Sequence, residues 1–164
     1  MNIIESIEYN DNSNYIGYII KFKNNDNYVK IMLSNNVSCC EEYYVKAHQN
    51  IKKFIGKKIK NIKVLTFVDN KFYDYNDNIY DILNDEDVIN DIEIDNIIYE
   101  IINKKSYKNE EKMVYILINM YNYKSMLITM TNIHNSYYPH DYFVHYKLFL
   151  KDDIIVERYI KGEI

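Results

Sequence analysis

Runs rich in Ile and Tyr recur along this chain of 164 residues and are separated by short polar segments. Runs of this length and composition, bounded by Asn and Asp, predict β-strands joined by hairpin turns. In the first half the predicted strands are Ile3–Tyr9, Tyr15–Phe22, Tyr28–Leu33, Tyr43–Ala47 and Ile59–Val68. In the second half they are Ile92–Ile102, Lys112–Met120, Lys124–Thr131, Tyr142–Leu150 and Ile154–Ile160.

One stretch, residues 48–57, has the period of a helix. Its apolar residues follow the i, i+3, i+4 spacing of one helix face, and its lysines take the other side. The apolar residues are Ile51, Phe54 and Ile55. Asn50 suits the N-cap and Gly56 suits a left-handed terminator. The pattern therefore predicts one short helix of about two and a half turns.

Together these elements predict an α+β fold that is mostly antiparallel β. Short strands at regular spacing, linked by hairpins, favour a curled sheet or partly open barrel with one short helix. A chain of this length suits one domain spanning residues 1–164, and no linker divides it. The acidic stretch around residues 69–95 has loop composition and is interpreted as an insertion.

The composition is strongly skewed, since Ile, Asn, Lys and Tyr make up 89 of the 164 residues. These are the residues that A- and T-rich codons supply, which indicates a large DNA virus, a phage of an AT-rich bacterium or a protist. Tyrosine then partly replaces Phe and Trp as core filler. No apolar run is long enough to span a bilayer. The N-terminal residues also lack the pattern of a signal peptide, so we expect a cytosolic location.

Charge is unevenly distributed along the chain. Residues 69–95 hold ten acids and one base, whereas residues 43–63 hold seven lysines and no acid. The lysines are interpreted as a solvated face opposite the acidic segment or as a patch that binds phosphate or a partner. The candidates for this patch are Lys46, Lys52, Lys53, Lys57, Lys58 and Lys60. The net charge of -4 argues against a general nucleic-acid binder.

Both cysteines lie beside two carboxylates in the run Cys39-Cys40-Glu41-Glu42. Adjacent strand residues point to opposite faces, and the Cys-x-x-Cys spacing of most zinc sites is absent. Packed thiols are therefore the first interpretation. A metal site or a catalytic thiolate remains an alternative, but a thiolate would need a neighbouring base to lower the cysteine pKa.

Histidines form a second cluster, and aromatic residues surround it. His134, His140 and His145 could join Cys39, Cys40 and Glu41 in a mixed Cys/His site that would accept zinc. On a strand His140 would point away from His145, whereas Asp141 would share its face. The nearby aromatic stretch could line a groove or pack in the core. Its members are Tyr137, Tyr138, Tyr142, Phe143 and Tyr146.

Several segments follow one another in an order that carries a resemblance. The run Ile31-Met32-Leu33-Ser34 precedes the Cys39-Cys40-Glu41 run, and residues 51–56 close in Ile-Gly. The hairpin Met113–Thr131 is followed by Asn135-Ser136-Tyr137-Tyr138. This order resembles a family of small uncharacterised domains of bacteriophages and giant viruses, which have glycine where Ser136 stands and serine where Pro139 stands. The resemblance implies an α+β fold with antiparallel strands and brings no established activity.

The combined observations favour a virus-encoded accessory protein that acts as a non-enzymatic binding module for a host or viral protein or a small ligand. The alternative is a small metal-dependent or cysteine-dependent hydrolase built on the Cys/His residues. No catalytic residue and no cofactor is predicted, with zinc as the alternative. Because the chain has only three glycines, we expect no glycine-rich phosphate-binding loop. We expect no membrane or nucleic-acid partner, a location in the host cytoplasm or the virion, and a homodimer through the edge strand Ile154–Tyr159.

Overall fold

In a computed structural model, the described residues form two antiparallel sheets and one α-helix. The structure describes residues 1–35, 42–68, 71–74, 81–82, 92–104, 111–133, 139–149 and 154–164. The first sheet has the order β1-β2-β3-β10-β11. Its strands are β1 (Ile4–Asp11), β2 (Tyr15–Phe22), β3 (Tyr28–Ser34), β10 (Asp141–Phe149) and β11 (Ile155–Glu163).

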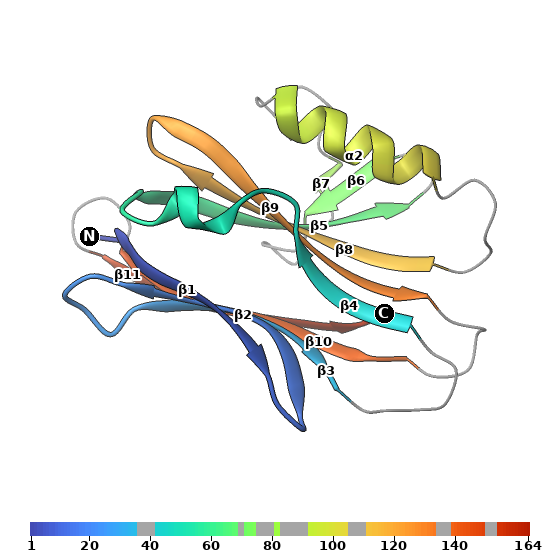
Figure 1. Ribbon diagram of the computed structural model, residues 1–164, viewed down its shortest axis with the longest axis horizontal. Coiled ribbons are helices and arrows are strands. Elements are labelled where there is room, and N and C mark those ends of the chain that lie inside the picture. Colours follow the sequence, from blue (N-terminus) through green and yellow to red (C-terminus); the bar gives the residue numbers. More distant parts are fainter. Residues whose placement is uncertain are drawn as a thin grey trace.

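The second sheet has the order β4-β9-β8-β5-β6-β7 and lies against the first (Figure 1). Its strands are β4 (Glu42–Ala47), β9 (Tyr123–Ile133), β8 (Glu111–Met120), β5 (Ile59–Val68), β6 (Lys71–Asp74) and β7 (Asp81–Ile82). A 3-10 turn, η1 (Ile51–Phe54), precedes β5, and the helix α2 (Ile92–Lys104) precedes β8. The predicted α+β, mostly antiparallel class is confirmed, and neither sheet is closed.

The main core lies between the two sheets because alternate residues of each strand point inward. From the first sheet, β3 contributes Val29, Ile31 and Leu33, all fully buried. From the second sheet, Ile116 and Ile128 pack against the same cluster. The outward residues of β3 and β10 are thereby placed on the opposite, solvent-facing side of the first sheet.

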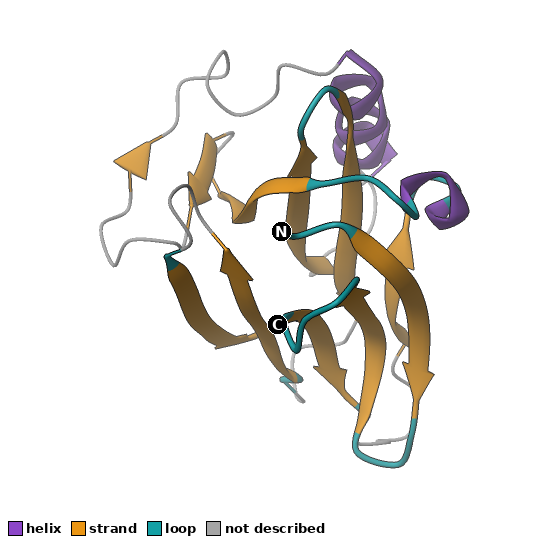
Figure 2. Ribbon diagram, turned by 90° about the vertical axis from the view of Figure 1, so that its left-hand side faces the viewer, coloured by secondary structure: helices purple, strands orange, loops and turns teal. Residues whose placement is uncertain are grey.

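The helix α2 covers the outer face of the second sheet (Figure 2). Ile94 and Ile98, one turn apart, are buried in a second cluster with Leu65 of β5 and Tyr115 of β8. The apolar run Ile92–Ile102 predicted a strand, and this prediction was wrong. β-branched residues favour strands locally, but their helical spacing lets one face of α2 bury its isoleucines on the sheet.

The helix predicted for residues 48–57 is also corrected, because only the single turn η1 forms. Asn50 does cap this turn by accepting from Lys52 N–H, and Gly56 does adopt a left-handed φ of 80°. Helix growth stops because residues 56 and 57 pair with the edge of β1. Gly56 N–H donates to Ile4 O at 2.9 Å, and Ile4 N–H donates to Lys57 O at 2.9 Å.

Asn2 joins the start of the chain to the end of β10. Its side chain donates to Phe149 O at 2.6 Å and accepts from Phe149 N–H at 2.8 Å. Asn2 is 2% exposed, and its own carbonyl accepts from Ile59 N–H. The side-chain amide therefore satisfies both backbone groups of the last residue of β10, as another strand would.

The remaining differences concern boundaries and the acidic stretch. The predicted bounds of β2 and β5 agree with the structure, whereas β1 begins at Ile4 and β11 runs from Ile155 to Glu163. Within the stretch predicted as a loop, the short strands β6 and β7 extend the second sheet. No helix in the described part of the chain is both long and apolar enough to cross a membrane.

Candidate binding face on the first sheet

The solvent-facing side of the first sheet carries a continuous set of aromatic side chains. Tyr15 of β2 meets Phe143 of β10 edge to face, with ring centroids 5.2 Å apart. Phe143 stacks on Tyr159 of β11 at 5.6 Å. Tyr159 meets His145 at 5.2 Å, and His145 meets Tyr28 of β3 at 5.0 Å. The contacts link four neighbouring strands, and Tyr159 is 58% exposed.

An open hollow of about 390 Å³ lies at one end of this face. Its aromatic lining includes Tyr15, Phe143 and Tyr159, and its charged lining consists of Asp141, Lys161 and Glu163. Tyr142 and Gly162 complete the lining. Asp141 stands directly opposite Glu163 in the β10–β11 register. Like charges in opposite positions destabilise a strand pair, so a cation between them would relieve their repulsion.

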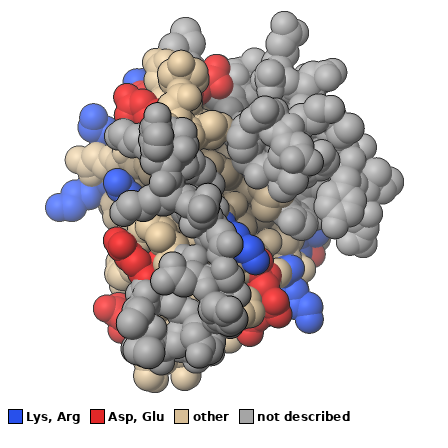
Figure 3. All heavy atoms as spheres, turned by 90° about the vertical axis from the view of Figure 1, so that its right-hand side faces the viewer, with Lys and Arg blue, Asp and Glu red and all other residues tan. Residues whose placement is uncertain are grey.

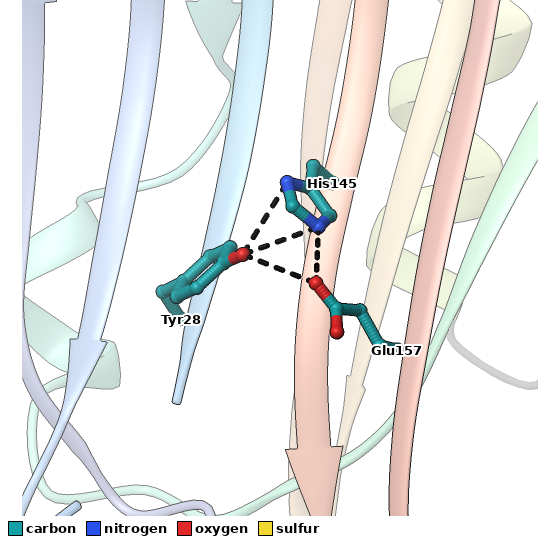
Figure 4. Close-up of polar contacts among 3 residues, drawn as sticks. All are labelled: Tyr28, His145 and Glu157. Atoms are coloured by element: carbon teal, nitrogen blue, oxygen red, sulfur yellow. Dashed lines mark hydrogen bonds and ion pairs between the residues drawn. The ribbon is translucent and has the colours of Figure 1, made fainter. Parts of the chain in front are cut away.

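His145, Glu157 and Tyr28 form a polar group next to the hollow (Figure 4). His145 Nε2 lies 2.8 Å from Glu157 Oε1 and 3.1 Å from Tyr28 Oη. Tyr28 Oη also donates to Glu157 Oε1 at 3.4 Å. The hydrogen bond from His145 lowers the pKa of the Glu157 carboxyl. Burial, followed by the charge of Glu157, raises the pKa of the Tyr28 phenol.

This group does not have the arrangement of a proton relay. In a relay, the acid and the nucleophile occupy opposite nitrogens of the imidazole. Here the shortest contacts of Tyr28 and Glu157 are both to Nε2, whereas Nδ1 lies 3.4 Å from Tyr28 Oη. The group therefore fixes three side chains across β3, β10 and β11 and holds a carboxylate at the surface.

The sequence-predicted Cys/His candidates are only partly placed by the structure. Cys39, Cys40, Glu41 and His134 lie outside the described residues. His140 is buried, and its Nδ1 lies 3.0 Å from Ser34 O. Its ring packs against Tyr43 with centroids 4.2 Å apart.

His140 and His145 face opposite sides of the first sheet, as strand alternation predicts. His140 is buried, whereas His145 belongs to the exposed aromatic face with Tyr159. Within the described ranges, no three His, Cys, Asp or Glu side chains are grouped so that they could hold a metal ion.

The predicted lysine patch gathers mostly around η1 and the start of β5. Lys57 lies over the ring of Tyr123 at 4.2 Å, and Lys58 lies over Tyr121 at 4.6 Å. Lys52, Lys53 and Lys60 are exposed in the same region, whereas Lys46 is exposed on β4. At the end of the molecule seen in Figure 3, the described acidic and basic side chains are intermingled.

His48, which follows β4, is a half-buried titratable group near Lys46. Its Nε2 lies 2.9 Å from Thr129 Oγ1. Burial, and secondarily the charge of Lys46, lowers its pKa from 6.5 to about 4. Between about pH 6.5 and pH 4, the unfolded chain therefore binds a proton at His48 that the folded protein does not bind. Because this proton favours the unfolded chain, the stability that depends on a neutral His48 is present above pH 6.5 and is lost as the pH falls towards 4.

On acidification from about pH 7.5 to about pH 4.5, we expect protonation linked to His48 to lower the free energy of unfolding by about 1–2 kcal/mol. Solvent screening keeps the effect this small, since the histidine is only half-buried. Denaturant titrations at about pH 7.5 and about pH 4.5 would measure it, with His48→Gln as the control that can still bond Thr129. Equal acid sensitivity of the wild type and His48→Gln would contradict this assignment.

Only part of the aromatic face was predicted from the sequence. Of the predicted aromatic stretch, Phe143 lies on the face, whereas Tyr142 and Tyr146 are buried in the core. Tyr137 and Tyr138 lie outside the described residues. Tyr15 and Tyr159 were missed because their neighbours come from distant strands, although their place in each strand's alternation was readable.

Comparisons with protein-family models, curated proteins and solved structures found no match to this chain. The function is therefore inferred from the fold and from the aromatic face described above. The resemblance to phage and giant-virus domains stays a prediction.

Proposed function

We propose that this protein is a non-enzymatic binding module whose aromatic face takes a protein partner. The hollow beside Phe143 is the observation that carries the proposal. Exposed tyrosines are common at protein interfaces because they bury a large apolar area and keep a polar tip. Here the rings are held in place by contacts across four strands, so little ordering is required when a partner binds.

The charges favour a partner that presents a lysine or arginine side chain. Asp141 and Glu163 supply two carboxylates at the hollow against the single ammonium of Lys161. Tyr15, Phe143 and Tyr159 supply ring faces, which attract cations when water is excluded. A hollow of about 390 Å³ at the surface suits a side chain or a small ligand.

We further propose that the protein is virus-encoded and acts in the host cytoplasm on a host or viral protein. The support is the codon-driven composition, in which 89 residues are Ile, Asn, Lys or Tyr. Phosphate or nucleic acid is a less suitable partner for this face, because carboxylates outnumber the lysine at the hollow.

A displayed peptide library selected on the wild-type protein would test the binding proposal. We expect selected peptides to contain Arg or Lys, and to bind Phe143→Ser and Tyr15→Ser at least about tenfold more weakly. Tyr99→Ser is the matched control, because Tyr99 is 71% exposed on α2, in the opposite layer. Equal binding to the Phe143→Ser and wild-type proteins would reject the face as the binding site.

A second candidate is the metal-dependent or cysteine-dependent hydrolase built on Cys39, Cys40, His134 and His140. One observation favours it: the contacts of buried His140 include Ser34 and Tyr43, which precede and follow the cysteine run in the sequence. Native mass spectrometry of protein purified without chelators separates the candidates. A mass excess equal to zinc that is lost in His140→Ala would favour the hydrolase, whereas the binding proposal expects the bare mass.

A further inference from the structure

We propose that β11 pairs with β11 of a second copy of this chain around a two-fold axis at Tyr159, which joins the two first sheets into one. β11 is an edge strand of nine residues, and it has no neighbour on its outer side among the described strands. Its register with β10 is unbroken from Ile155 to Glu163. Long regular edges of this kind are templates for another strand.

The other edge of the first sheet is closed to such pairing. β1 has a register shift between Ile4 and Ser6. The backbone of Ile4 is already bonded to Lys57 and Gly56. A bulge and a covering segment are the means by which proteins protect edges, and β11 shows neither in the described structure.

The free hydrogen-bonding groups of β11 follow from its pairing with β10. His140 and Ile164 exchange both backbone hydrogen bonds, at 2.8 and 3.0 Å. Antiparallel pairs alternate between bonded and non-bonded, so the even-numbered residues of β11 bond to β10. The odd-numbered residues then direct their N–H and C=O groups to the free edge. These are Ile155, Glu157, Tyr159, Lys161 and Glu163.

An axis at Tyr159 makes this edge complementary to itself. It places Glu157 opposite Lys161 of the second copy, twice, and Tyr159 opposite its own equivalent. All nine residues of the strand are then paired. Glu157 Oε1 accepts from Tyr28 Oη of β3 and contacts His145 of β10, which fixes the Glu157 side chain on the aromatic face of the first sheet.

Neighbouring axis positions are unfavourable because each opposes like charges. An axis at Glu157 or Lys161 places that residue against itself. An axis at Arg158 places two arginines opposite each other, and an axis at Ile160 places Glu157 opposite Glu163. Among the axis positions from Glu157 to Lys161, the charges of β11 thus select Tyr159.

The side chains at the edge also suit a buried position. Ile155 is 48% exposed and Tyr159 is 58% exposed. Pairing about Tyr159 would bring the two exposed rings together, next to Phe143 of each copy. Because the axis is perpendicular to the sheet, the aromatic faces of both copies remain on one side. We expect dissociation constants of about 1–100 µM, since the predicted interface is small.

Sedimentation analysis of charge-reversed variants tests the pairing. In a dimer of Glu157→Lys, the new lysine of each copy faces Lys161 of the other copy. In a dimer of Lys161→Glu, the new glutamate of each copy faces Glu157 of the other copy. Each variant should dimerise at least about tenfold more weakly than the wild type. An equimolar mixture of the two variants should recover dimers, because both contacts of the mixed dimer then join Lys to Glu.

Three results would overturn the inference: a wild type that stays monomeric up to about 100 µM, single variants that dimerise like the wild type, or a mixture that does not recover. If Glu157→Lys fails to fold, two single-cysteine variants, Tyr159→Cys and Glu157→Cys, test the axis instead. Both would carry Cys39→Ser and Cys40→Ser so that the introduced cysteine is the sole thiol. Tyr159→Cys should form a disulfide between copies, since bonded partners lie about 5.5 Å apart. Glu157→Cys should not, because it faces Lys161, and equal cross-linking of both would reject the axis.

The dimer and the binding face can fail separately. Glu157→Lys leaves every residue that lines the hollow in place, whereas Phe143→Ser leaves the charges of β11 unchanged. Peptide binding without dimers would therefore reject only the pairing, and dimers without peptide binding would reject only the binding proposal.

Discussion

Replacing Gly17 with alanine should lower the free energy of unfolding by about 3–5 kcal/mol, combining backbone strain with overpacking against a rigid neighbour. Gly17 has a φ of 149°, a conformation that side-chain-bearing residues rarely adopt. A Cβ there would lie 1.9 Å from Ile31 O of β3. The neighbour is a backbone carbonyl of the adjacent strand β3, so it cannot move without breaking the β2–β3 register.

Gly56→Ala is the matched control for this substitution. Gly56 also has a positive φ, 80°, but nothing lies within 4 Å of the position its Cβ would take. Alanine there should lower the free energy of unfolding by about 1 kcal/mol, from the conformational term alone. Urea titrations of both variants would measure the two effects. A loss at Gly17 no greater than that at Gly56 would show that β2 and β3 are not held this closely.

Asn2→Ala should lower the free energy of unfolding by about 2–4 kcal/mol. The substitution removes two hydrogen bonds and leaves the N–H and C=O of Phe149 without the partners they have in the folded protein. Unsatisfied buried polar groups carry a desolvation penalty of about 1–3 kcal/mol each, which exceeds the net value of an ordinary hydrogen bond. Asn2→Asp should not restore the stability, because a buried carboxylate oxygen would then face the carbonyl oxygen of Phe149, and neither atom can donate.

Asn25→Ala provides the comparison for Asn2→Ala. The Asn25 side chain also donates to two backbone carbonyls, those of Met1 and Lys23, and it accepts from Asn27 N–H, but Asn25 is only half-buried. Water can replace the two exposed contacts but not readily the one to Asn27 N–H, so the free energy of unfolding should fall by about 1 kcal/mol, less than for Asn2→Ala. Similar losses for the two variants would mean that burial of Asn2 does not decide its contribution.

Local strand signals were readable from this sequence, whereas the competition between local and tertiary forces was not. The bounds of β2 and β5 follow from the apolar runs and the turns beside them. The isoleucines of α2 looked like a strand because β-branched residues prefer one. Their burial on Leu65 and Tyr115 determined the helix, and neither neighbour is close in sequence. Residues 56 and 57, likewise, pair with β1 instead of continuing η1.

The candidate face was less predictable than the fold because it depends on strand order. Alternation indicates that Phe143 and His145 share a side of β10, but not that β3 and β11 flank them. Tyr28 and Glu157 reach His145 from 117 and 12 residues away in sequence. With 19 tyrosines in the chain, composition could not distinguish the ring that binds from the ring that packs.

The strand order also determines when, during synthesis, β3 can pair with its second neighbour. β3 pairs on one side with β2, its neighbour in sequence, but on the other side with β10. Roughly 100 residues separate Ser34 from Asp141, so a ribosome at ordinary speed needs about 5–20 s to supply the second partner. Before β10 emerges, the backbone edge of β3 that pairs with it has no partner, and Val29, Ile31 and Leu33 lack the rest of their core cluster. A nascent chain of this kind would depend on chaperones until β10 emerges.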